Sequence, residues 1–231
     1  MNVLVCQNIT FQYPGTETYV FKDLTCQVPN SGFHALFGPS GVGKTTLARM
    51  MAGEMGGFLG DIRRDDMNTV LYSYNLERLP GWYSVGNHLE EVTPDANKQR
   101  IQDVVRSFGL EACTGARFSQ LSLGQQNRIN LARYLLQDFD LLIMDESLAN
   151  VDEATREQII FKIKEMFSEK SFLYISHNVL EISRFCDEVL ILRASQKTPQ
   201  VISVRGQGLV SGQSLKEQDL ELTMLEIMHA A

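Results

Sequence analysis

A glycine-rich segment and the lysine that follows it are the clearest candidates for chemistry in this sequence. The segment reads Gly38-Pro39-Ser40-Gly41-Val42-Gly43-Lys44-Thr45-Thr46, and its first eight residues fit the pattern G-x-x-x-x-G-K-[ST]. It follows an apolar run and opens a predicted helix, the context that a phosphate-binding loop requires. Such a loop turns backbone N–H groups around a phosphate, and the helix N-terminus adds positive charge. We therefore expect Lys44 to contact β- and γ-phosphates and the Thr45 hydroxyl to contact Mg²⁺.

Two carboxylates form the second candidate group. Residues 141–144 are uniformly apolar and predict a buried strand that ends in Asp145 and Glu146. Asp145 suits the shell of a magnesium ion, whereas Glu146 is placed to polarise a water molecule that attacks the γ-phosphate. An acidic turn after a strand is the alternative interpretation. The phosphate-binding motif elsewhere in the chain favours the catalytic one.

A third motif lies between the other two and precedes a predicted helix. It reads Leu121-Ser122-Leu123-Gly124-Gln125-Gln126-Asn127-Arg128. This string resembles the LSGGQ signature of ABC ATPases, and residues 1–205 are similar to that family throughout. Its other landmarks occur in the family's order: an aromatic residue before the phosphate loop (Tyr13), a loop after the third core strand (Asn75), a D-loop that ends at Asp152, and a histidine after a strand (His177).

The resemblance implies a head-to-tail dimer in which ATP lies between the phosphate loop of one subunit and the signature of the other. Ser122, Gly124 and Gln125 would then meet the γ-phosphate from the second subunit, because a helix N-terminus with a free hydroxyl binds anions. Asp152 would bridge the two subunits. Both Ser122 and Asp152 also fit an ordinary role as helix N-caps, and the two roles are compatible.

The resemblance also implies roles for the remaining landmarks. Tyr13 would stack on adenine with Val20 packed nearby, although an aromatic residue in a β-rich segment is often part of a core. His177 would contact the γ-phosphate and steady the attacking water together with Glu146. Asn75 stands at the place of the Q-loop glutamine and would reach the Mg²⁺ shell.

Three positions depart from the family pattern. Leu123 replaces the first glycine of the signature, and Gly124 retains the close backbone approach. Asn75 is one methylene shorter than glutamine. Ser147 replaces the proline that commonly follows the catalytic glutamate, which alters the stiffness of the loop but removes no ligand.

The predicted elements place these motifs in an α/β fold. Helices are expected over 44–52, 96–108, 125–136 and 153–167, with core strands at 141–144 and 172–175. The first 37 residues predict short strands that form an antiparallel layer. The fold class is therefore a P-loop NTPase, an ABC ATPase cassette with an antiparallel β layer, a RecA-like core and a helical lobe. A single domain is expected over 1–231, with the lobe at 83–135 and a short C-terminal extension at 206–231.

Composition narrows the classes of function. The chain has 231 residues, of which 44% are hydrophobic, enough for one large domain. Its 21 basic and 28 acidic residues leave a net charge of −7, the wrong sign for general binding of nucleic acid. No apolar run approaches the roughly 18–20 residues of a membrane span. The four cysteines are scattered, which predicts reduced core thiols and argues against a zinc site.

The resemblance, together with the lack of a membrane span, implies an ATPase subunit that drives solute transport through a separate membrane permease. The predicted partners are that permease, a second copy or a paralogous ATPase, and a periplasmic or extracellular solute-binding protein, with the chain on the cytoplasmic face of the membrane. The segment 79–87 is similar to the nitrate, sulfonate and taurine importer ATPases. A soluble ABC ATPase that remodels a cytosolic complex and a low-turnover nucleotide switch remain as alternatives.

Overall fold

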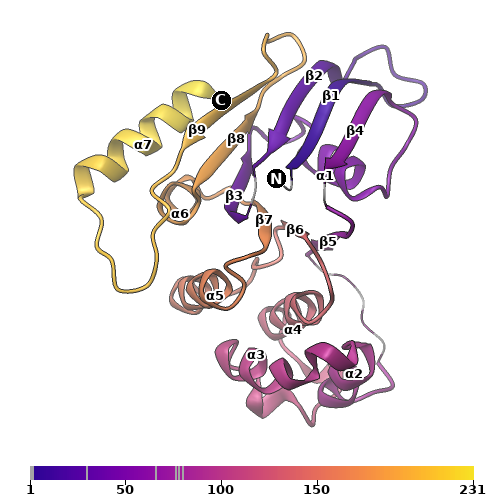
Figure 1. Ribbon diagram of the computed structural model, residues 1–231, viewed down its shortest axis with the longest axis vertical. Helices are drawn as coiled ribbons and strands as arrows, with labels where there is room; N and C mark the ends of the chain where they lie inside the picture. Colours follow the sequence, from indigo (N-terminus) through magenta and orange to yellow (C-terminus); the bar gives the residue numbers. More distant parts are fainter. Residues whose placement is uncertain (1–2, 30, 66, 76, 78, 80) are drawn as a thin grey trace.

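The computed structural model describes residues 3–29, 31–65, 67–75, 77, 79 and 81–231 (Figure 1). Along the chain its elements are β1 (Val3–Phe11), β2 (Phe21–Val28), β3 (Gly32–Phe37), α1 (Lys44–Ala52), β4 (Leu59–Asp65), β5 (Val70–Tyr74), α2 (Val85–Val92), η1 (Asp95–Arg100), α3 (Ile101–Ser107), η2 (Glu111–Cys113), η3 (Phe118–Gln120), α4 (Leu123–Leu135), β6 (Leu141–Asp145), α5 (Glu153–Met166), β7 (Ser171–Ile175), α6 (Val179–Phe185), β8 (Glu188–Leu192), β9 (Val201–Arg205) and α7 (Glu217–Ala230).

A six-stranded sheet forms the centre of the molecule, in the order β5-β6-β7-β3-β8-β9. All neighbours pair in parallel except β8 and β9, which are antiparallel. The prediction placed 33–37 in the antiparallel layer, which is wrong, because β3 lies between β7 and β8 in this central sheet. Its side chains are buried on both faces, as a central parallel strand requires.

A separate three-stranded antiparallel sheet, in the order β2-β1-β4, covers one side of the molecule. Its third strand, β4, has the sequence LGDIRRD and is exposed at five of its seven positions. Such a polar run carries almost no strand pattern, so the sequence did not predict it. Pairing with β1, from Thr10↔Leu59 to Val3↔Asp65, gives the segment its extended form.

The buried residues form two hydrophobic clusters on opposite faces of the central sheet. Strand β6 shows the division clearly, because Leu142 and Met144 join the cluster beneath the helices, whereas Leu141 and Ile143 join the cluster with α1 and the antiparallel sheet. A strand covered on both faces in this way needs apolar side chains at every position. The ends of the central strands are thereby held rigidly, and the candidate polar residues follow them.

The helices between β5 and β6 lie at the end of the molecule away from the three-stranded sheet (Figure 1). The single helix expected over 96–108 is divided into η1 and α3. Asn97 explains the tighter first part, because its side chain donates to the carbonyl of Leu136 at 3.1 Å and to the Asp138 carboxylate at 3.0 Å. Those bonds hold the start of the segment against the end of α4.

Two further features of the structure concern the apolar character of the helices and the state of the cysteines. Within the described ranges, no helix combines the length and apolar character needed to cross a membrane. The four cysteines, Cys6, Cys26, Cys113 and Cys186, are all buried and free.

Candidate active site

The glycine-rich segment connects β3 to α1 as a loop that only glycine allows at its two ends. Gly38 has φ +152°, and a Cβ there would lie 2.2 Å from the carbonyl oxygen of Leu192. Gly43 has φ +109° and caps α1, with Val20 so close that a Cβ would lie 2.7 Å from its side chain. Glycine at both ends thus allows the tight loop that leads directly into the N-terminus of α1, the arrangement that a phosphate site uses.

Lys44 lies at the centre of this loop. Its ammonium donates to the carbonyl oxygens of Gly38 at 2.8 Å and Pro39 at 3.0 Å, and only 7% of the residue is exposed. Burial lowers the pKa of Lys44, while the carboxylates of Asp145 and Glu146 oppose that shift. The result is a cation held by the loop beside two carboxylates.

Asp145, the last residue of β6, faces the loop from the neighbouring part of the sheet. Its Oδ2 atom accepts from the Thr45 hydroxyl at 2.7 Å and from the Tyr72 hydroxyl at 2.8 Å. Burial and the hydrogen bond to Asp145 raise the pKa of Tyr72, so that this hydroxyl stays protonated and donates. Sequence reasoning missed Tyr72. Its place two residues before the end of the strand that precedes Asn75 was the available signal, but the pairing of that strand with β6 was not predicted.

Glu146 and His177 form a direct pair. The imidazole Nε2 of His177 lies 2.7 Å from Glu146 Oε1, and both side chains are about half exposed, at 54% and 41%. Glu146 has φ +51° and its backbone N–H donates to the carbonyl of Ile175 at 3.1 Å. Because β6 and β7 are parallel neighbours, their carboxyl ends carry these two residues to the same edge of the sheet.

One pocket of about 370 Å³ collects most of the predicted site residues, a size that suits a small-molecule site. Its lining consists of Tyr13, Val20, Ser40, Gly41, Gly43, Lys44, Thr45, Thr46, Asp145, Glu146 and His177. The members come from the loop before β2, the loop before α1, and the ends of β6 and β7. Tertiary structure thus brings together groups that are separated by more than a hundred residues.

Tyr13 forms one wall of this pocket. Its hydroxyl lies 2.6 Å from the Thr46 hydroxyl, and its ring packs edge-on against Phe11 with 5.0 Å between the centroids. Two partners therefore fix the ring, while 43% of the residue remains exposed. A second, adjoining pocket is lined by Tyr13 and Val20 together with Val42 and residues 194–197. Tyr13 and Val20 therefore line both pockets.

The signature residues lie elsewhere. Ser122 caps α4, its hydroxyl accepting from the backbone of Gln125 at 3.2 Å while the Gln125 side chain accepts from the Ser122 backbone at 2.9 Å. Gly124 is packed so tightly that a Cβ would lie 2.5 Å from the carbonyl oxygen of Asn150. Neither Ser122, Gly124 nor Gln125 is among the described residues that line the phosphate pocket. Within one chain, this anion-binding helix end and the phosphate loop are separate.

Asp152 likewise lies outside the phosphate pocket, at the start of α5. Its carboxylate accepts from the backbone N–H of Thr155 at 2.9 Å, and that bond lowers the pKa of the exposed carboxyl. The N-cap role is therefore present in the single chain. Contact with a second subunit stays a prediction.

Asn75 follows β5 beside Asp145. Its backbone N–H donates to the carbonyl of Asp145 at 3.2 Å. Its side-chain oxygen accepts from Asn127 at 2.9 Å, and the same Asn127 amide donates to the carbonyl of Ala149. Asn75 therefore links the end of β5 to the signature helix and to the loop after Glu146. It does not line the phosphate pocket as described.

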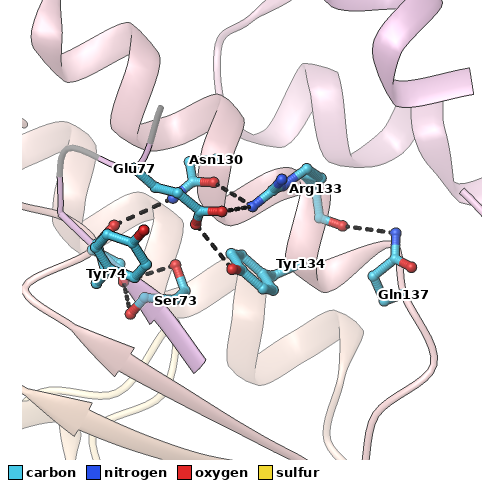
Figure 2. A network of polar contacts seen from close by, with 8 residues as sticks. Ser73, Tyr74, Glu77, Asn130, Arg133, Tyr134 and Gln137 are labelled. Carbon is cyan, nitrogen blue, oxygen red and sulfur yellow. Dashed lines mark hydrogen bonds and ion pairs between the residues drawn. The ribbon is translucent and has the colours of Figure 1, made fainter. Parts of the chain in front are cut away.

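Glu77, two residues farther on, is held entirely by α4 (Figure 2). Its carboxylate accepts from the guanidinium of Arg133 and from the Tyr134 hydroxyl, and Arg133 also donates to the side chain of Asn130. Burial and the adjacent carboxylate raise the pKa of Tyr134, which keeps the hydroxyl a donor. The Glu77 carboxylate is thus bound to α4, and Asn75 is the residue that lies beside Asp145.

The serine that departs from the family pattern also has a defined contact. The Ser147 hydroxyl is 3.0 Å from both the carbonyl and the hydroxyl of Ser73, so it joins the loop after Glu146 to β5. A proline at this position could not make that bond. Serine at this position thus lacks the stiffness of a proline ring but makes a hydrogen bond to β5.

A sequence profile described as ABC transporter matches residues 21–149, which include the phosphate loop, the signature and both carboxylates. The chain belongs to the ABC transporter family. This ABC protein is 36% identical over 187 residues to the molybdenum import ATP-binding protein ModC 2 of Bradyrhizobium diazoefficiens, covering 74% of this chain and 21% of that protein. It is 28% identical over 206 residues to the spermidine/putrescine import ATP-binding protein PotA of Fusobacterium nucleatum, covering 82% of this chain and 54% of that protein.

This ABC chain matches only part of the length of each relative. It is also 31% identical over 187 residues to the molybdenum import ATP-binding protein ModC of Brucella suis, and the match covers 72% of this chain and 52% of that protein. The chain thus spans between about a fifth and about half of the length of the three curated relatives it matches.

Solved structures agree on the fold. A bacterial Atm1-family ABC exporter with ATP bound superposes with a TM-score of 0.74 at 18% identity, covering 99% of this chain and 41% of that one. An inward-facing metal-chelate type ABC transporter superposes with a TM-score of 0.72 at 17% identity, covering 97% and 89% of the two chains. The ABC ATPase fold, with its antiparallel sheet and α/β core, is confirmed.

Proposed function

We propose that this chain is the ATP-hydrolysing subunit of an ABC importer. The observation that carries the proposal is the pocket in which Lys44, Thr45, Asp145, Glu146 and His177 converge. A lysine and a ring of backbone N–H groups suit the phosphates, and a carboxylate–imidazole pair suits a water molecule at the γ-phosphate.

Each residue has a separable task in this reaction. Lys44 stabilises the negative charge that spreads over the β/γ-phosphate oxygens in the transition state. Glu146 orients the attacking water and accepts its proton, while His177, 2.7 Å from Glu146 Oε1, fixes the direction of that carboxylate. Tyr13 would stack on the base, beside Val20, in the adjoining pocket.

Magnesium fits the oxygen groups at this edge of the sheet. The Thr45 hydroxyl and the Asp145 carboxylate already share one contact at 2.7 Å, and Mg²⁺ prefers few protein oxygens together with phosphate oxygens. Thr45 and Asp145 would hold the ion, with the carboxamide oxygen of Asn75 as a further ligand. When bound, the ion neutralises charge on the phosphate oxygens.

The separation of α4 from the phosphate pocket supports a head-to-tail dimer. A second copy, or a paralogous ATPase, would present Ser122, Gly124 and Gln125 to the γ-phosphate, with Asp152 at the shared boundary. A membrane permease would be the other partner, which places the chain at the cytoplasmic face of the membrane, and a solute-binding protein would complete the importer.

The relatives favour import. They are molybdenum and spermidine/putrescine import proteins, rather than the nitrate, sulfonate or taurine importers that the segment 79–87 suggested. Pro80 of that segment lies outside the described residues. The proposal therefore names importer but no solute. A soluble remodelling ATPase and a low-turnover switch remain the rivals that experiment must separate.

The deciding experiment measures phosphate release from MgATP by the wild type and two variants. Lys44→Ala should lower turnover at least about a hundredfold, because the transition-state charge loses its main cation. Glu146→Gln should lower turnover by about the same factor while ATP binding persists, because the substitution removes only the proton acceptor.

Two outcomes oppose the proposal. Wild-type turnover in Lys44→Ala would exclude this pocket as the site of hydrolysis, and a wild type with no turnover above the variants would favour the switch. A remodelling ATPase is separated from an importer by reconstitution, because only an importer subunit gains turnover when a permease is added in a lipid vesicle.

A further inference from the structure

A buried ion pair lies behind the candidate active site and belongs to no task assigned so far. Arg156 on α5 contacts Glu181 on α6, with 3.4 Å between Nη1 and Oε2. The Glu181 side chain is 6% exposed and that of Arg156 is 24% exposed. A carboxylate buried to this degree persists only when its acceptor capacity is used.

Glu181 uses that capacity on the segment that carries His177. Its two oxygens accept from the Ser176 hydroxyl and from the Tyr174 hydroxyl, each at 3.1 Å. Burial and the Glu181 charge hold the pKa of Tyr174 well above its usual range, so this hydroxyl donates at all ordinary pH values. The Ser176 hydroxyl in turn accepts from the backbone of Asn178 at 3.2 Å, which completes a turn around His177.

Arg156 holds the other catalytic turn. Its Nη2 atom donates to the carbonyl of Val151 at 2.6 Å, in the loop that follows Glu146 and precedes α5. That loop begins with a bond from the Ala149 N–H to the Glu146 carbonyl at 2.9 Å. One guanidinium therefore joins the turn after Glu146 to the carboxylate that fixes the turn of His177.

We infer that the Arg156–Glu181 pair is a positioning device. It holds the turn after Glu146 and the turn around His177 in fixed positions relative to each other, so that His177 reaches Glu146. The inference rests on the proposed hydrolysis and adds two positioning residues to it. Neither residue lines the phosphate pocket as described, so both act through the turns they hold. The planar guanidinium fork is suited to this, because it can bind a carbonyl and a carboxylate at the same time.

The same two helices offer a matched control. Glu157 of α5 pairs with Arg184 of α6 at 3.0 Å, with 30% and 24% of their side chains exposed. This neighbouring pair joins α5 to α6 with similar burial of its arginine. The hydrogen bond from Arg184 to Glu157 connects the two helices and reaches neither turn.

The kinetic test compares Arg156→Gln and Glu181→Gln with Glu157→Gln and Arg184→Gln. The first two variants should lower kcat about tenfold or more with KM for ATP changed less than about twofold, because misplaced catalytic groups cost rate rather than binding. The control variants should stay within about twofold of the wild type. Equal losses in both pairs would overturn the inference.

A double-mutant cycle with His177→Ala shows whether the pair acts through the histidine. If it does, Arg156→Gln should lower kcat less than about twofold further in that background, because the positioned group is already absent. Losses that multiply would instead mean that the pair serves only the packing of α5 on α6. Arg156→Lys, which keeps the charge but not the fork, should give an intermediate kcat and guards against a variant that fails to fold.

Hydrogen exchange followed by mass spectrometry tests the structural part without any turnover. Arg156→Gln should raise exchange in both peptides that cover 146–152 and 175–179, whereas Glu157→Gln should raise it in neither. Faster exchange confined to the helices would refute the link between the turns. If the wild type hydrolysed no ATP, the proposed function would fail while this measurement still decided the positioning role.

Discussion

The phosphate loop and the start of α4 are both helix N-termini suited to anions, yet they are built differently. The phosphate loop adjoins groups from four parts of the chain. Lys44 donates to two carbonyls of the loop, and the Thr45 hydroxyl donates to Asp145. At the start of α4, Ser122 and Gln125 satisfy each other in a capping box, and Gly124 packs against the Asn150 carbonyl. One region lines a pocket, and the other lies outside that pocket as described.

The difference shows what one chain can and cannot supply. The polar groups that converge at the phosphate loop supply one part of the proposed site within one subunit. The start of α4 offers backbone N–H groups, a hydroxyl and a helix dipole, but Ser122, Gly124 and Gln125 are not among the described residues that line that pocket. In the dimer proposed above, a second copy would bring this helix start to the phosphate loop of the first.

The largest expected effect comes from mixing two inactive subunits. Lys44→Ala disables the phosphate loop, and Gly124→Asp disables the signature, because any Cβ at Gly124 meets the Asn150 carbonyl at 2.5 Å. Each variant alone should lose turnover at least about a hundredfold. An equal mixture should regain about a quarter of the wild-type rate, since half of the dimers are mixed and each holds one intact composite site.

Phosphate release over a range of mixing ratios measures this recovery. A mixture as inactive as its components would show that each chain hydrolyses ATP with its own phosphate loop and its own signature. The difference between the two regions would then not require a second subunit. Wild type diluted with Lys44→Ala serves as the control for subunit exchange.

A smaller effect is expected at the Glu77 clamp, in which Glu77 binds Arg133 and Tyr134 near the end of α4. Glu77→Gln removes a carboxylate, 15% exposed, from Arg133 and Tyr134 on α4. We expect the free energy of unfolding to fall by about 1.5–3 kcal/mol, the value of hydrogen bonds to a charged group. Affinity of the phosphate pocket for ATP should stay unchanged, because Glu77 does not line it as described.

Urea unfolding and nucleotide titration provide the two readouts. Glu165→Gln is the control, because Glu165 pairs with Lys162 on an exposed face of α5, and it should change stability by less than about 0.5 kcal/mol. Equal losses in both variants would mean that the Glu77 clamp contributes no more than a surface pair.

The smallest effect is expected at Asn75, which touches both regions. Asn75→Ala removes the acceptor of Asn127 at 2.9 Å and should lower basal turnover about threefold, the scale of one neutral hydrogen bond. Asn75→Gln keeps a carboxamide and should remain within about twofold of the wild type. If the alanine variant matched the wild type both alone and with a permease, the Q-loop assignment of Asn75 would be wrong.

Much of this protein's local structure could be predicted from short sequence motifs. The phosphate loop and the capped start of α4 have local sequence signals, in which residue type and spacing suffice for prediction. The buried strand before Asp145 was predictable because its residues are uniformly apolar. Helix α1 begins and ends at the predicted residues 44 and 52. The family followed from the order of these motifs.

Strand partners were beyond the reach of local patterns. Residues 33–37 read as another short strand of the N-terminal layer, and only their pairing with β7 and β8 places them in the central sheet. The charged segment 59–65 forms a strand because β1 lies beside it. Backbone hydrogen bonds between distant segments decided both cases.

Contacts across long sequence distances also decided the finer chemistry of the site. The sequence by itself determined the phosphate loop, the acidic residues that face it and the family to which the chain belongs. Only the tertiary structure assigned Tyr72 to Asp145, Glu77 to α4 and Arg156 to the turns around Glu146 and His177. The physical reason is that a side chain's hydrogen-bond partners depend on which strands and helices pack together, and packing is a property of the whole chain.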